Sequence, residues 1–157
     1  CFDISHLSGT AMVGSMVQFR NGKPDKSNYR RFKIKNVAGQ DDFAAMREVV
    51  TRRYKRLLDE ETGMPDLVVV DGGLGQVGAA EGALKSLGLE LEVIGLAKEN
   101  EEIYVPNVNI PKKFDSNGRM MLLLRQIRDT AHNFAVRYNR KRRQMKMRNE
   151  FRRITIG

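Results

Sequence analysis

The stretch VVVDGGLGQVG (Val68–Gly78) runs from a β-branched segment through an aspartate into spaced glycines. The apolar run predicts a buried strand that ends at Asp71, and the glycines predict a tight turn into a helix. Gly73, Gly75 and Gly78 also fit G-x-G-x-x-G, the spacing of a dinucleotide-binding turn. The stretch therefore has two competing interpretations: a loop that binds a nucleotide, and a turn that presents Asp71.

The dinucleotide interpretation has points in its favour and two difficulties. A predicted strand precedes the glycines and a predicted helix follows them. Glu99 follows Gly78 by about 20 residues, as does the ribose-binding acid of such a site. However, the carboxylate of Asp71 would face the pyrophosphate and repel it. The chain also has no room for a second mononucleotide-binding half. A tight strand-to-helix turn needs the glycines under either interpretation.

Hydrophobic periodicity divides the rest of the chain into strands and helices. Asn21 and Gly22 accept the positive φ angles of a hairpin turn, and Asp41 opens a helical pattern that Gly63 ends. In chain order we expect strands at 2–8, 16–19 and 29–34, a helix from 41, a strand at 66–71, a helix at 76–87 and a strand at 92–98. A loop at 104–118 follows, and then one long helix, or two in tandem, from 119 to about 151. This order predicts an α/β fold with a mixed five-stranded sheet, three antiparallel strands followed by parallel additions, flanked by helices.

Length and composition indicate one folded domain. The chain has 157 residues, of which 41% are hydrophobic and 30% charged, which is typical of a globular protein with a real core. No apolar run reaches the ~18 residues of a membrane span, so no membrane partner is expected. A single cysteine excludes an internal disulfide and fits a reducing cytoplasm. Because the chain begins at Cys1 without a methionine, we expect it to be a fragment of a larger protein.

The positive charge is concentrated near the C-terminus. The formal net charge is +9, and residues 137–153 contain nine lysines or arginines and one acid, Glu150. Such a run is often only a solvated helix face. The same density of charge is also what a phosphate-binding surface carries, and it predicts salt-dependent binding of nucleic acid.

Three residues are candidate metal ligands. Asp3 lies on the first predicted strand, Asp71 at the end of the fourth, and His132 on the last helix. Two carboxylates and an imidazole suit a divalent cation that activates water beside a phosphodiester. The alternatives are structural: either acid could cap a turn or helix, and His132 could be an ordinary helical residue. His6, the competing histidine, is expected to have a surface role.

Several blocks of unusual sequence together resemble one known family. They are CFDISH, DDFAAMREV, PDLVVVDGGLGQ, IGLAKE and IRDTAHNFAV. These blocks resemble the C-terminal endonuclease domain of bacterial UvrC, which has a ribonuclease H-like fold, and the resemblance spans nearly the whole chain. It implies a single endonuclease domain over residues 1–157 that lacks the family's other modules. In the family, the metal-binding triad falls on Asp3, Asp71 and His132.

The resemblance also implies an activity and partners. The activity is hydrolysis of the phosphodiester 5′ to a bulky lesion in damaged double-stranded DNA, within the UvrABC nucleotide excision repair system of the bacterial cytoplasm. Asp3 and Asp71 would anchor Mg²⁺ or Mn²⁺, and His132 would complete the coordination or take a proton from water. Because the triad has one carboxylate fewer than many relatives of this fold, we expect one ion. In the longer proteins UvrB is the partner, through a segment outside this chain.

Other residues are candidates for supporting roles. Glu48 is a candidate outer acid or salt-bridging residue, and Asp129 could orient the imidazole of His132 or pair with an arginine. The predicted DNA-binding residues are Lys98, Arg125, Arg128, Arg137, Arg140 and Lys141. Two other functions stay open: a non-catalytic nucleic-acid-binding module of the same fold, and a nucleotide-cofactor enzyme.

Overall fold

The first strand, β1 (Phe2–His6), lies in the middle of a six-stranded sheet. In this computed structural model, which describes residues 1–7, 11–97 and 102–156, the strand order across the sheet is β5-β2-β1-β6-β7-β8. The other strands of this sheet are β2 (Met12–Met16), β5 (Arg30–Lys33), β6 (Leu67–Asp71), β7 (Glu92–Leu96) and β8 (Ile103–Tyr104). The central position of β1 places its side chains between those of β2 and β6.

The antiparallel half of the sheet has three strands, as the sequence predicted, but the second strand, β2, is Met12–Met16 and not residues 16–19. Gly14 and Ser15 interrupt the apolar pattern of this segment, so the sequence did not indicate it as a strand. β2 pairs with β1 and with β5, both antiparallel. The predicted turn also forms: Asn21 and Gly22 have φ angles of 54° and 78° and join β3 (Phe19–Arg20) to β4 (Lys23–Pro24). These two short strands form a separate ribbon, and a 3₁₀ turn (Lys26–Asn28) leads back to β5.

The other half of the sheet adds β6 and β7 in parallel, as expected, and one strand that the sequence did not predict. β8 pairs antiparallel with β7, and its outer edge pairs with Lys112 through two backbone hydrogen bonds at Ile103. The prediction of five strands is therefore corrected to six. A two-residue strand is too short to show alternation, so only its pairing with β7 identifies it.

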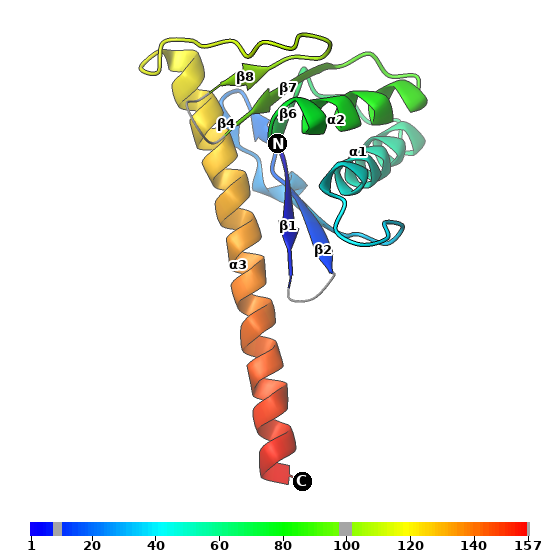
Figure 1. Ribbon diagram of the computed structural model, residues 1–157, viewed down its shortest axis with the longest axis vertical. Coiled ribbons are helices and arrows are strands. Elements are labelled where there is room, and N and C mark those ends of the chain that lie inside the picture. Colours follow the sequence, from blue (N-terminus) through cyan, green and yellow to red (C-terminus); the bar gives the residue numbers. More distant parts are fainter. Residues whose placement is uncertain (8–10, 98–101, 157) are drawn as a thin grey trace.

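Helices cover both faces of the sheet (Figure 1). α1 (Asp42–Asp59) and α2 (Leu74–Ser86) lie on one face, and α3 (Arg119–Ile156) lies on the other. The larger core fills the space under α1 and α2 and includes Phe2, Val49 and Val70. A smaller cluster lies on the α3 side and includes Val69, Leu96, Ile103, Met121 and Leu124. Alternate residues of β6 thus serve opposite faces.

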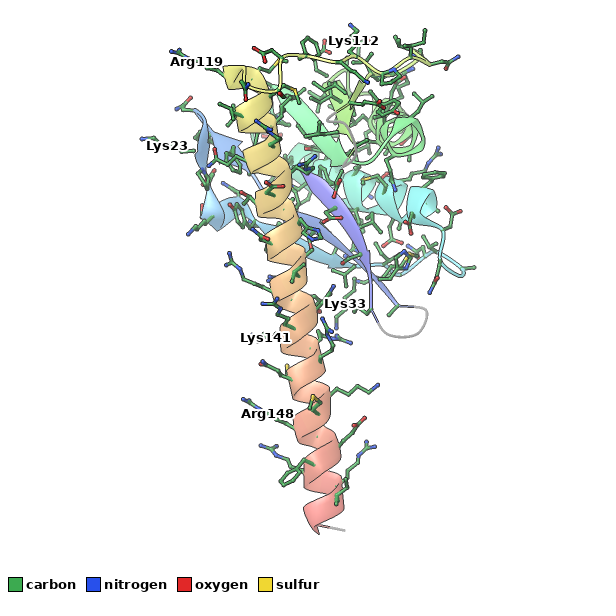
Figure 2. All side chains as sticks on the ribbon, turned by 60° about the vertical axis from the view of Figure 1, so that its left-hand side comes forward. Lys23, Lys33, Lys112, Arg119, Lys141 and Arg148 are labelled. Carbon is green, nitrogen blue, oxygen red and sulfur yellow. The ribbon has the colours of Figure 1, made fainter. Side chains whose placement is uncertain are left out.

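α3 is one uninterrupted helix of 38 residues, and it ends at Ile156, about five residues beyond the end that the sequence indicated. Its first half packs on the sheet through Met121, Leu124, Ala131 and Ala135, which are all buried. Its second half runs past the β1–β2 end of the sheet and extends away from the rest of the molecule (Figures 1 and 2). Within the described ranges, no helix combines the length and apolarity that crossing a bilayer requires.

Candidate metal centre

Asp3, Asp71 and His132 converge at one point of the structure. Each offers one ligand atom, and these atoms lie within 4.8 Å of one another. Nδ1 of His132 lies 3.6 Å from Oδ2 of Asp3. The burial is graded, because Asp3 is buried, Asp71 is half-buried and the His132 side chain is 49% exposed. The cluster is therefore anchored in the sheet and open to solvent on the side of α3.

The two aspartates are neighbours because their strands are. β1 and β6 run parallel, and the register pairs Phe2 with Val70. Phe2 and Val70 both belong to the core beneath α1 and α2. Since side chains alternate along a strand, the next residues, Asp3 and Asp71, point to the opposite face, toward α3.

The chain turns sharply directly after Asp71. Gly72 has a φ of 152°, outside the range that most L residues adopt, and its N–H donates to the carbonyl of Leu96 at 3.2 Å. A Cβ built on Gly95 of the adjacent strand would lie 2.6 Å from the Gly72 carbonyl oxygen and 2.5 Å from Cγ2 of Val77. Both glycines therefore let the β6–α2 turn pack tightly against β7 and hold Asp71 at the strand end.

His132 reaches the aspartates because α3 is fixed to the antiparallel half of the sheet. The guanidinium of Arg31 on β5 lies 3.6 Å from the centre of the Phe134 ring and donates to the Phe134 carbonyl at 3.1 Å. Tyr29 contacts the same ring, with centroids 5.2 Å apart. Local sequence patterns do not indicate these anchors, because they join segments about 100 residues apart.

A row of side chains links the anchor to the metal-binding candidates. Ser15 pairs with Asp3 across β1 and β2, and Arg31 pairs with Ser15 across β2 and β5. Ser15 is fully buried, and its hydroxyl has no hydrogen-bond partner among the described residues. Asp3, Ser15 and Arg31 therefore lie side by side on the face of the sheet that α3 covers.

The donor set fits a hard divalent cation. Two carboxylates and one imidazole on rigid elements supply oxygen and nitrogen ligands of the kind that Mg²⁺ and Mn²⁺ accept. The ligand atoms already lie close enough together to share one ion. The residues therefore can hold a divalent metal without rearrangement of the sheet.

The competing histidine, His6, lies outside this cluster. Its side chain points to the other face of β1, where Nε2 lies 2.7 Å from Oδ1 of Asp42 at the start of α1. Asp41, the preceding residue, caps that helix by accepting from the N–H groups of Phe43 and Ala44. His6 thus joins β1 to α1, in agreement with its expected surface role.

The predicted phosphate-binding arginines near His132 are both engaged in the structure. Arg125 donates to the carbonyl of Ser116 and ties the preceding loop to α3. Nε of Arg128 lies 3.5 Å from Asp129, so Asp129 pairs with an arginine rather than orienting the imidazole. The Arg128 side chain is only 13% exposed, and its Nη1 has no hydrogen-bond partner among the described residues.

The remaining DNA-binding candidates fall in two groups. Arg137, Arg140 and Lys141 are exposed on the part of α3 that follows Ala135, where Figure 2 labels Lys141. Lys98 lies outside the described residues. The structure does not test a contact with DNA for any of them.

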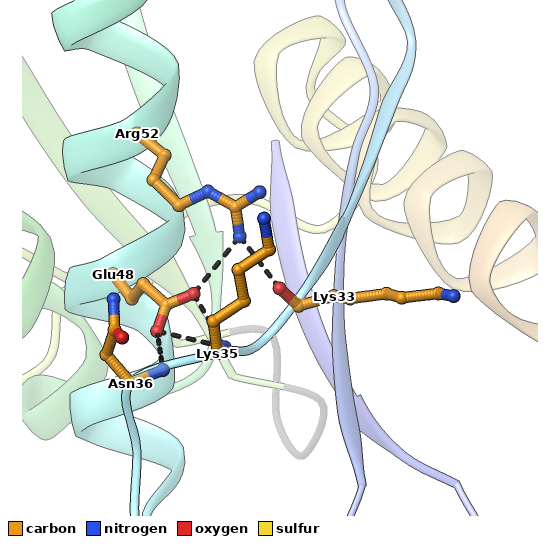
Figure 3. Close-up of polar contacts among 5 residues, drawn as sticks. All are labelled: Lys33, Lys35, Asn36, Glu48 and Arg52. Atoms are coloured by element: carbon orange, nitrogen blue, oxygen red, sulfur yellow. Dashed lines mark hydrogen bonds and ion pairs between the residues drawn. The ribbon is translucent and has the colours of Figure 1, made fainter.

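Glu48 lies on α1, which covers the face of the sheet opposite α3, and has a structural role (Figure 3). Its carboxylate accepts from the backbone N–H groups of Lys35 and Asn36 and from Nη1 of Arg52, which also donates to the Lys33 carbonyl. Burial alone would raise the pKa of Glu48, but these donors hold it below its ordinary value. Glu48 therefore fastens the segment after β5 to α1 as a salt-bridging residue.

Comparison with known proteins shows the family. A model of the family described as the UvrC RNAse H endonuclease domain matches residues 1–136. The chain belongs to the UvrC ribonuclease H endonuclease domain family. All three metal-binding candidates lie inside the matched range, and the mixed sheet with helices on both faces is the ribonuclease H-like fold of this UvrC domain.

Relatives named UvrABC system protein C support the same assignment. The relative from Methanococcus maripaludis is 56% identical over 140 residues, which are 89% of this chain and 27% of the relative. The relative from Methanosarcina barkeri is 54% identical over 94% of this chain and 28% of its own length. The relative from Chlorobaculum tepidum is 54% identical over 91% of this chain and 23% of its own length. The chain thus spans about a quarter of the UvrC relatives that it matches.

Proposed function

We propose that this chain is a metal-dependent DNA endonuclease domain that hydrolyses the phosphodiester on the 5′ side of a bulky lesion in nucleotide excision repair. The observation that carries the proposal is the convergence of Asp3, Asp71 and His132 within 4.8 Å in a UvrC endonuclease domain. The names of the relatives point to the UvrABC system as the setting.

Each residue of the cluster has a distinct part in this proposal. Asp3 and Asp71 hold a divalent cation, Mg²⁺ or Mn²⁺, at the end of β6. When bound, such a cation polarises a phosphate and lowers the pKa of water. His132 is the most exposed of the three, so it can complete the coordination or accept a proton from the attacking water. With only two carboxylates in the cluster, one ion is the proposed occupancy.

Arg128 is the best-placed of the predicted phosphate contacts. It lies one turn before His132 on the same side of α3, and its buried Nη1 has no hydrogen-bond partner among the described residues. A phosphate oxygen at the site would satisfy this donor. Arg125 and Lys98 stay proposed contacts to the DNA backbone. Arg137, Arg140 and Lys141 are proposed to attract the DNA through their positive charge, in keeping with the net charge of +9.

The proposed partners follow from the relatives. We propose that damaged double-stranded DNA binds at the cluster. We propose that UvrB binds the longer proteins, of which this domain forms about a quarter. Residues 1–157 are proposed to act as a single domain, located in the cytoplasm. A non-catalytic DNA-binding module remains the alternative, and only an assay of incision separates the two.

The test is incision by a UvrC protein that carries this domain in place, with UvrA, UvrB and a lesion-bearing duplex. Asp3→Asn, Asp71→Asn and His132→Ala should each lower the rate of 5′ incision by at least about 100-fold, because metal sites are sensitive even to loss of supporting residues. DNA binding should stay within about twofold, since none of the three supplies the positive charge. Asp59→Asn, at an exposed carboxylate at the end of α1, is the matched control and should cut normally. Undiminished incision in all three variants would support the non-catalytic alternative.

A further inference from the structure

A cationic groove lies between the end of β1 and the part of α3 that continues past the sheet. Its volume is about 820 Å³, within the usual range for ligand-binding clefts. One wall includes His6 and Leu7, and the other is formed by α3. The charged residues that line the α3 wall are Arg142, Arg143, Lys146 and Arg153, with one acid, Glu150.

The groove is aligned with the metal-binding cluster. Its walls are continuations of the two elements that carry Asp3 and His132, and both run in the same direction in Figure 1. On α3, Asn139 and Lys146 follow His132 at intervals of seven residues, close to two turns, so they lie on its side of the helix. At 1.5 Å per residue, the first of these positions is about 10 Å from His132 along the axis.

The chemistry of this side of α3 changes where the sheet ends. Up to Ala135 it is apolar and buried against the sheet, with Met121, Leu124 and Ala131. Beyond that point the residues of α3 that line the groove are polar or charged, beginning with Asn139, and Met145 is the one apolar residue among them. If another folded segment packed against this part of α3, the helix would need apolar residues there. The cations instead indicate a polyanion as the occupant.

We propose that this groove binds the sugar–phosphate backbone of the DNA strand that is cut, on one side of the scissile bond. The placement relative to the cut rests on the function proposed above. Because successive nucleotides of B-form DNA advance 3.4 Å along the axis, the groove begins about three nucleotides from the cluster. All four lysines and arginines that line the groove lie beyond residue 136, where the family match ends, so the family assignment alone does not indicate them.

The proposal separates two sets of cations on one helix. Arg142, Arg143 and Lys146 line the groove. Arg137, Arg140 and Lys141 are exposed at positions that helical geometry turns to the other side of α3. Phosphates held in the groove contact the first set directly. The second set contributes only long-range attraction.

The experiment compares two triple variants that remove the same charge. The groove variant is Arg142→Gln, Arg143→Gln and Lys146→Gln, and the matched control is Arg137→Gln, Arg140→Gln and Lys141→Gln. Binding of a fluorescent 20-nucleotide DNA to the 157-residue chain is measured by anisotropy without metal, at several salt concentrations. The groove variant should bind at least about tenfold more weakly, and the slope of log affinity against log salt should fall by about 2 to 3, or ~0.9 per lost phosphate contact. The affinity of the control variant for DNA should fall by less than about threefold, and its slope of log affinity against log salt should change by less than about 1.

The result that overturns the proposal is an equal loss in the two triple variants, since the whole charge of the helix would then account for binding. Single-stranded and duplex forms of the DNA are measured separately. The form that binds more tightly is the one whose backbone the groove accepts, and the difference between the two triple variants must appear with that form. Thermal unfolding of both variants verifies that they are folded. The measurement does not depend on the cluster, because an Asp3→Asn background should show the same difference between the triples even if the proposed nuclease activity fails.

Discussion

Oδ2 of Asp3 lies 3.6 Å from Nδ1 of His132, although the two residues come from opposite ends of the chain. Asp3 is held by the centre of the sheet, whereas His132 depends on how α3 docks on the same face. The geometry of the cluster therefore depends on the contacts that hold α3 against the sheet. Arg31 supplies the most specific of these contacts.

Replacing Arg31 should loosen α3. Arg31→Leu removes the hydrogen bond to the Phe134 carbonyl and the stacking on its ring, so the free energy of unfolding should fall by about 1–2 kcal/mol in urea titrations. Binding of Mn²⁺ should weaken as well, because His132 is two residues from Phe134. Arg20→Leu removes an exposed pair with Asp25 and should cost less than about 0.5 kcal/mol. Equal stability of the two variants would show that Arg31 does not fix α3.

The turn after Asp71 can be tested with a pair of glycines. Gly95→Ala should destabilise the fold by about 1–3 kcal/mol and weaken metal binding, because the new Cβ would meet the Gly72 carbonyl and Val77. Gly78→Ala meets nothing within 4 Å and lies in α2, so it should stabilise by about 0.5–1 kcal/mol. Calorimetric melting with and without Mn²⁺ measures both effects. A Gly95→Ala protein that melts and binds metal like the original would mean that this close approach does not position Asp71.

Glu48 should make the stability depend on acid. Its folded-state pKa is below the unfolded value of about 4.3, so its ionised form stabilises the fold above that pH, and this contribution is lost as the pH falls through the lower folded-state pKa. Glu48→Gln should cost about 1–3 kcal/mol at pH 7, and the difference from the original protein should shrink in acid below pH ~4. Glu60→Gln, at an exposed pair with Arg56, is the control and should leave the free energy of unfolding nearly unchanged, because solvent screens this pair. A pH-independent cost for Glu48→Gln would contradict this account.

Much of this architecture could be predicted because local patterns specify it. The run that ends at Asp71 is apolar enough to indicate a buried strand, and Asn21 and Gly22 indicate a hairpin turn; both form as expected. The convergence of Asp3 and Asp71 with His132 followed only from the resemblance to a family, because spacing in the sequence does not show which strands become neighbours. The register of Phe2 with Val70 supplies that information.

Other features could not be predicted, for identifiable reasons. β8 has two residues and exists through its pairing with β7. Arg31 reads as an ordinary strand residue until α3 is placed over it. The sequence shows the basic run near the C-terminus, but not which of its cations line the groove. The rotation of α3 about its own axis decides this, and buried residues such as Met121 and Ala135 set that rotation by packing on the sheet. Spacing of seven residues from His132 was the feature of the sequence that could have indicated which residues share its side of α3.

The central claim is that Asp3, Asp71 and His132 together bind a divalent cation. The most direct measurement is anomalous scattering from a crystal of the 157-residue chain soaked in Mn²⁺. We predict one anomalous peak, about 2.0–2.6 Å from a carboxylate oxygen of each aspartate and from a ring nitrogen of His132. Two fully occupied peaks within ~4 Å would contradict the single-ion assignment. The absence of any peak at the cluster, with Mn²⁺ bound elsewhere in the crystal, would contradict the metal centre itself.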